Sequence, residues 1–148
     1  MRVKINLAQF KDALGEERAK YNAAARPAAQ AGAQVIYDLA RAKAPVSSSG
    51  HYFHGTSFKK TGQKYYFAAG SLKSSIYQVF SKDHSSATRA TYHISWNRTK
   101  APYAWMVEYG TSRAAPHPAT MPANAEGQAL AIPAKREESG RLVNAGQS

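Results

Sequence analysis

Cysteine is absent from this chain of 148 residues, which excludes disulfide bonds and metal sites built on thiolates. No apolar run approaches the length of roughly 20 residues that a membrane-spanning helix requires. The first residues, MRVKINLAQFKDAL, also lack the continuous apolar segment of a secretory signal. These absences are compatible with a folded protein of a reducing cytoplasm, and we expect no membrane partner.

Acidic residues are scarce. Nine Asp and Glu stand against twenty Lys and Arg, which gives a formal net charge of +11 and a pI of about 10.0. Twelve of the basic and four of the acidic residues lie in the first 74 positions, so the excess is not confined to a terminal tail. A charge of this size predicts an anionic partner, such as nucleic acid or an acidic protein surface.

The first third of the chain has the pattern of a long helix. Residues 2–5 (RVKI) are expected to form a short strand, and Asn6 is a plausible N-cap because its side-chain oxygen can accept a backbone amide. Apolar and alanine residues then recur at spacings of three and four from Leu7 to near Lys43. Pro27 lies inside this pattern and is expected to kink the helix or divide it in two.

The middle of the chain predicts a loop and then a β-hairpin. Residues 45–70 contain four glycines and a serine run without periodicity, which is typical of a loop. Apolar residues then occupy even positions in 71–80 and again in 89–97. This alternation predicts two antiparallel strands joined by a polar connection at 82–86.

One face of the predicted hairpin is expected to be buried. Ile94 and Trp96 lie on its apolar face, and we expect that face to pack against the alanine-rich helix. The fold class is therefore predicted as α+β, with a single domain over residues 1–132 into which the loop 47–69 is inserted. The polar residues 133–148 are expected to form a C-terminal arm.

Few residues of the chain suggest a catalytic, metal or ligand-binding site. His51 and His54 have no neighbouring carboxylate or thiolate to complete a metal site, so we expect no metal and no cofactor. Lys59, Lys60 and Lys64 lie among five aromatic residues, a combination used by nucleic-acid-binding surfaces. The alternative, which we favour, is a solvated loop whose aromatic residues pack on the hairpin or on a neighbouring subunit.

The segment PYAWMVEYGTSR (102–113) places Glu108 among large apolar residues. Pro102 can open a short helical turn and Gly110 can end it in a left-handed conformation. A buried carboxyl at position 108 could act as a general acid, but the sequence nominates no catalytic partner. We therefore favour a structural role, in which the Glu108 carboxylate accepts backbone amides of this same turn or meets an Arg of this or another subunit. A proline-rich, extended segment is expected to follow at 112–123.

Taken in order, several short motifs resemble the tail-completion or neck proteins of tailed bacteriophages, the gene-product-ten-like tail components. The matching stretches are ARAKAPV (40–46), GSLKSSIY (70–77), a hairpin, PYAWMVEYGTSR (102–113) and HPATMPA (117–123). The chain departs from the family pattern in the excursion 47–69 and in having Pro118-Ala119 where Pro-Phe is usual.

The resemblance implies a small domain with a long helix against an antiparallel sheet, followed by a last helix. It also implies a structural virion protein at the head–tail junction or tail, assembled in the host cytoplasm into a homo-oligomeric ring, often sixfold. Its partners would be neck, connector and tail proteins and the DNA in the channel, and no catalytic residues come with the family. On this view a subunit interface or a structural corner is formed by Tyr103, Trp105, Glu108, Tyr109, Gly110 and Thr111. DNA or an acidic partner is contacted by Lys59, Lys60 and Lys64.

The competing hypotheses are a basic nucleic-acid-binding protein and an enzyme that uses His54 or Glu108.

Overall fold

The computed structural model describes residues 7–145 except residue 57, and its fold is α+β, as predicted. The predicted strand at 2–5 and the N-cap at Asn6 lie outside the described residues. The elements, in chain order, are α1 (Leu7–Lys43), β1 (His51–Phe53), α2 (Phe58–Thr61), β2 (Tyr65–Phe67), α3 (Ser71–Ser75), β3 (Ile76–Ser86), β4 (Arg89–Trp96), α4 (Ala104–Tyr109) and α5 (Thr120–Ala145).

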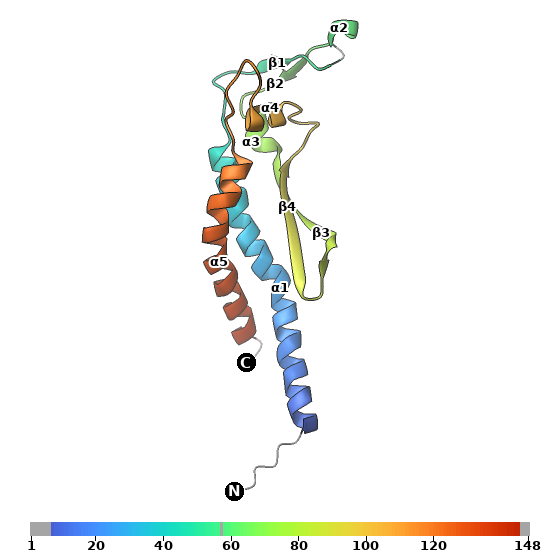
Figure 1. The fold of residues 1–148 in the computed structure, drawn as a ribbon, viewed down its shortest axis with the longest axis vertical. Coiled ribbons are helices and arrows are strands. Elements are labelled where there is room, and N and C mark those ends of the chain that lie inside the picture. The colour runs from blue at the N-terminus through green and yellow to red at the C-terminus, as the bar shows by residue number, and fades with distance from the viewer. Residues whose placement is uncertain (1–6, 57, 146–148) are drawn as a thin grey trace.

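The molecule is elongated along α1 (Figure 1). Helix α5 runs beside α1, and the β3–β4 hairpin lies against another side of α1. The small sheet β1–β2 and the short helices α2, α3 and α4 gather at one end, while both chain termini lie toward the other. None of the described helices is both long and apolar enough to span a membrane.

Helix α1 ends at Lys43, as predicted, but Pro27 neither ends nor divides it, because a single helix of 37 residues runs through this position. A proline inside a helix removes one hydrogen bond and costs about 3 kcal/mol. Packing against α5 and the hairpin offsets this cost, since Ala24 and Ala28, which flank Pro27, are both buried.

The predicted hairpin is present, with Ile76 paired to Trp96 and Ser81 to Thr91. Residues 82–86, predicted as the connection, instead belong to β3, whose register shifts between Ser81 and Ser86. The polar side chains there hold an irregular strand together, because the Ser85 hydroxyl oxygen accepts the Thr91 amide at 2.8 Å. The turn itself is the two residues 87–88.

The even-numbered face of the hairpin packs on α1 in part. The Arg26 guanidinium of α1 lies 4.2 Å from the centre of the Phe80 ring, and Ile94 packs against the α1 alanines. Trp96 packs instead against a second cluster around Tyr103, so the prediction that it covers the helix is wrong. Leu72 was predicted in the first strand, but it is buried on the short helix α3.

Residues 45–70 are not a plain loop. They contain the antiparallel pair β1–β2 and the short helix α2. The strands have three residues each, too few to show alternation in the sequence. Their pairing therefore depends on ring contacts with Tyr103, which is distant in the sequence.

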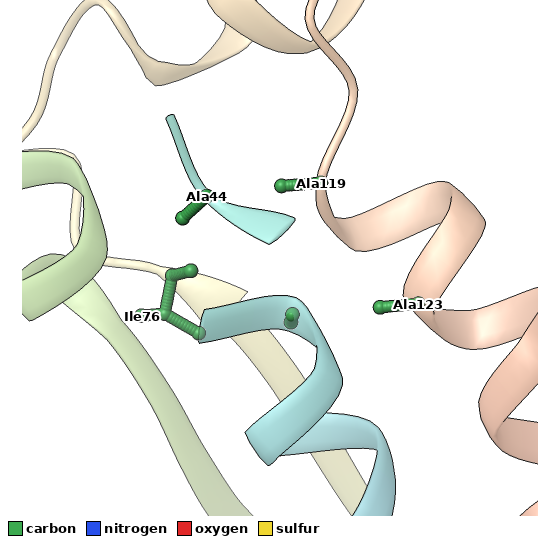
Figure 2. Close-up of a cluster of buried hydrophobic side chains, with 5 residues drawn as sticks. Ala44, Ile76, Ala119 and Ala123 are labelled. Carbon is green, nitrogen blue, oxygen red and sulfur yellow. The ribbon is translucent and has the colours of Figure 1, made fainter. Parts of the chain in front are cut away.

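Most of the core consists of alanine. Of the thirteen buried hydrophobic residues that the structure describes, ten are Ala. One cluster forms where the end of α1, the start of β3 and the start of α5 meet, with Ala40, Ala44, Ile76, Ala119 and Ala123 (Figure 2). Small side chains let α1 and α5 approach closely: a methyl group added at Gly127 would lie 2.6 Å from Cγ1 of Ile36.

Helix α5 corrects two predictions about the C-terminal part. It begins at Thr120, inside the segment 112–123 that was expected to be extended, and it continues through Pro133 to Ala145, where an arm was expected. Pro122 lies in the first turn, where a missing amide costs little. The expected boundary at 132/133 therefore falls inside a helix.

Candidate functional site

The candidate site is the corner formed by α4 and the segment that leads to α5. The loop before α4 is ordered by Asn97, whose side-chain oxygen accepts the amides of Thr99 and Lys100 at 2.9 and 3.3 Å. The amide of Ala101 bonds to the Asn97 carbonyl at 2.9 Å. Helix α4 begins after Tyr103 and ends at Tyr109, before Gly110. The predicted short helical turn is therefore present, but it starts two residues after Pro102, which does not open it.

Glu108 binds the first turn of α5. One carboxylate oxygen accepts the amides of Ala119 and Thr120 at 2.9 and 3.2 Å. The other accepts the Met121 amide at 2.7 Å and the Thr120 hydroxyl at 2.8 Å. These are the free amides of a helix N-terminus, and the next residue, Pro122, has none. Glu108 therefore caps α5 from another helix, 11 residues earlier in the chain.

Glu108 is 6% exposed, yet its surroundings favour the ionised form of its carboxyl. Burial alone raises the pKa of a carboxyl, but the hydrogen bonds from Ala119, Met121 and Thr120 outweigh burial and hold the pKa of Glu108 below its ordinary value. The positive end of the α5 dipole favours the same charged state. A carboxylate in this state has no proton to donate, and all four of its contacts serve to hold α5.

Gly110 allows the chain to reverse after α4. Its backbone has φ 76° and ψ −179°, which is not the left-handed helical conformation predicted but an extended one with positive φ that residues other than glycine rarely adopt. A methyl group here would also lie 2.9 Å from the backbone nitrogen of Pro116. The reversal is fastened by the His117 amide, which donates to the Val107 carbonyl at 2.7 Å, and by a bridge between Thr111 and Ala114.

Tyr103 links the corner to the β1–β2 sheet. Its ring lies 4.6 Å from His51, 5.2 Å from Phe67 and 6.1 Å from Phe53, measured between ring centres. Burial raises the pKa of Tyr103 and outweighs its hydrogen bonds with the Ser71 side chain and the Leu72 backbone. The phenol is therefore neutral, and it fixes the small sheet onto the rest of the molecule.

Two residues of the corner point away from the subunit. Trp105 and Tyr109 are 50% and 58% exposed, and their spacing of four places them on one face of α4. The six predicted residues thus divide into two groups. Tyr103, Glu108, Gly110 and Thr111 make contacts inside the subunit, whereas Trp105 and Tyr109 form an outward apolar pair.

The structure places Lys59, Lys60 and Lys64 away from this corner, on and just after α2, and all three are exposed. His54 stacks on Phe58 with ring centres 4.2 Å apart. No group of three His, Asp or Glu residues able to hold a metal ion occurs in the part of the chain that the structure describes.

Sequence reasoning missed Arg98. It lines a cleft of about 330 Å³ together with Phe53, Tyr65 and Phe67. No local pattern marks it, because the cleft forms only where the small sheet folds back over the chain after β4.

Sequence reasoning also did not predict that Glu108 binds the backbone amides at the start of α5, although Thr120 with Pro122 two residues later is a recognisable helix start.

Comparison of the chain with protein-family models, with curated proteins and with solved structures gives no match.

Proposed function

We propose that this chain is a structural subunit of a tailed-bacteriophage particle, which forms an oligomeric ring at the head–tail neck or the tail end. The family assignment is supported by the ordered motifs from ARAKAPV to HPATMPA. It is also supported by the last helix that the resemblance implies, since α5 begins at Thr120, within the HPATMPA motif. In this role the protein acts by assembly, and the proposal assigns it no catalytic activity.

The observation that carries the assembly proposal is the distribution of apolar side chains. Alanines fill the core, while thirteen large apolar residues among those described are exposed, Trp105 and Tyr109 with them. Exposed large apolar side chains in this number are typical of a subunit that completes its burial against neighbours.

The Trp105–Tyr109 pair is the contact that we assign to a neighbouring subunit. Aromatic residues dominate the energetics of protein interfaces, and this pair stands on a helix that is held rigidly from both ends. Glu108 on the same helix faces inward. It therefore positions the helix that carries the interface residues and does not itself contact the neighbouring subunit. A closed ring requires each subunit to present one surface to the next subunit's different surface.

Two experiments test the proposal at separate levels. Light scattering of the purified chain should give a mass several times 16.1 kDa, and Trp105→Ser should lower that mass while the circular-dichroism spectrum is retained. A monomer at high concentration would contradict the ring.

Phage particles made without this protein should accumulate as heads and tails that fail to join, and normal infectious particles would exclude the neck role.

A further inference from the structure

The charge of the molecule is strongly segregated. The end opposite the chain termini is built from segments 44–75 and 97–119 (Figure 1). The only acidic residue in these two segments is Glu108, which is buried and bound to α5. The same segments contain seven basic residues, namely Lys59, Lys60, Lys64, Lys73, Arg98, Lys100 and Arg113. We call this surface the basic end.

The basic residues of this end are not neutralised within the subunit. The ion pairs of the described residues join Lys20 to Glu17, Lys43 to Glu126 and Arg141 to Glu138, and all of them lie on α1 and α5. Lys59, Lys60, Arg98 and Lys100 are exposed. The basic end therefore attracts an anion from outside.

Aromatic rings at the same end are presented on both faces of the small sheet. Tyr52 and Tyr66 pair across the strands on the outer face, 64% and 60% exposed, with ring centres 5.3 Å apart. On the inner face, Phe53 and Phe67 rest on Tyr103 and leave the cleft that Tyr65 and Arg98 also line. Flat rings beside a guanidinium form a site into which an unpaired base can stack.

We propose that the basic end binds single-stranded nucleic acid. Bases stack in the Phe53–Tyr65–Phe67–Arg98 cleft and on the Tyr52–Tyr66 pair, while Lys59, Lys60 and Lys64 contact phosphates. An acidic protein would satisfy the lysines but would leave the exposed rings unused, and a duplex would keep its bases away from them. This inference goes beyond the proposed ring, and its cleft adjoins the Trp105–Tyr109 pair, because Arg98 also lines a cleft with Trp105.

The test is fluorescence anisotropy of the full chain with a labelled oligothymidylate of about 12 nucleotides in low salt. The logarithm of the affinity should fall linearly with the logarithm of salt concentration. The triple variant Lys59→Ala, Lys60→Ala, Lys64→Ala should reduce that slope by about 2, because each phosphate contact on a single strand contributes about 0.7. The matched control, Lys11→Ala, Arg18→Ala, Arg136→Ala, removes the same charge from exposed positions on α1 and α5 and should leave the slope unchanged.

A second pair of variants tests stacking separately from charge. Tyr65→Ala should lower the affinity about 5- to 100-fold with the salt slope retained, and Tyr65→Phe, which keeps the ring, should bind as the wild type does. The proposal is overturned if both triple variants lose affinity equally, if Tyr65→Phe and a folded Tyr65→Ala bind alike, or if a duplex or polyglutamate binds as tightly as the single strand. Because Tyr109 lines neither of the clefts that contain Arg98, loss of the ring in Tyr109→Ser with binding retained separates the two proposals.

Discussion

At the scale of single residues, the hydrogen bonds of the Glu108 carboxylate are the most sensitive to substitution. Three of its four hydrogen bonds come from the free amides of Ala119, Thr120 and Met121 at the start of α5, and the fourth comes from the Thr120 hydroxyl. Replacing the carboxylate with an amide removes the charge and turns one acceptor into a donor that faces other donors. The residue is therefore a structural cap whose partner lies within its own subunit.

The first prediction is that Glu108→Gln destabilises the fold by about 1–3 kcal/mol, because buried amides lose their acceptor. Urea unfolding at neutral pH measures this loss. Glu137→Gln is the matched control, since Glu137 is exposed on the same α5 and its replacement should change the stability by less than about 0.5 kcal/mol. Equal midpoints for the two variants would contradict the capping role.

The second prediction concerns pH. The pKa of Glu108 is lower in the folded state than in the unfolded state, so its contribution to stability is fully present above the unfolded pKa of about 4.3. That contribution disappears as the pH falls through the lower folded pKa. The stability difference between the wild type and Glu108→Gln should therefore be constant from about pH 6 to 8 and shrink below about pH 4. Urea midpoints across this range test the prediction, and a difference that grows on acidification would refute it.

The third prediction is that Gly110→Ala destabilises the corner by about 1–3 kcal/mol, because a methyl group there meets Pro116 and the backbone conformation favours glycine. Gly140→Ala should have the opposite effect. Gly140 lies in α5 with no atom near the added methyl, and alanine is the better helix former by about 0.8–1.0 kcal/mol. Thermal unfolding of the two variants should show shifts of opposite sign.

At the scale of elements, the stability of the molecule depends on the contact between α1 and α5. Alanine and glycine line this contact, and Lys43 of α1 forms an ion pair with Glu126 of α5 at 2.9 Å. That exposed pair contributes little, so close approach of the two backbones is the main source of stability there.

The fourth prediction tests this approach. Gly127→Val should force the helices apart at Ile36 and lower the free energy of unfolding by about 1–3 kcal/mol, as overpacking does. The control is Gly140→Val on the same helix, where nothing lies near the added atoms. Comparable urea midpoints for the two valine variants would show that the α1–α5 contact is not tightly packed.

The elements differ in how far the sequence predicts them. Helix α1 and the β3–β4 hairpin were predictable because their apolar periodicity extends over many residues. The sheet β1–β2 was not, since three-residue strands carry no periodicity and are held by Tyr103 from a distant segment. Residues beyond Pro133 looked like an arm because they are polar, yet α5 is helical there, and buried Ala131 lies just before the proline.

At the scale of the whole molecule, the protein has a small alanine core and a large exposed surface. A subunit of this kind gains stability from its neighbours, and oligomer formation links stability to concentration. The residues that we assign to this contact, Trp105 and Tyr109, lie on a rigid corner, so little conformational entropy is lost when they become buried.

The fifth prediction follows from that linkage. The melting temperature of the wild type should rise when its concentration is raised about 100-fold, because association stabilises the folded state. Trp105→Ser should abolish this dependence. Tyr52→Ser, which removes a still more exposed ring from the β1–β2 sheet, should retain it. A wild-type melting temperature that is independent of concentration would contradict the assembly proposal.

The class of fold, the long N-terminal helix, the hairpin, the short turn between Pro102 and Gly110 and the excess of positive charge were all predictable from the sequence. Each of these depends on local spacing or on composition, which a linear pattern records. The tertiary structure decided what Glu108 binds, which corner residues point outward, and that Arg98 meets the rings of the small sheet. These facts depend on contacts between segments far apart in the chain, and the direction of a side chain across such a contact is set by packing, not by its neighbours in sequence.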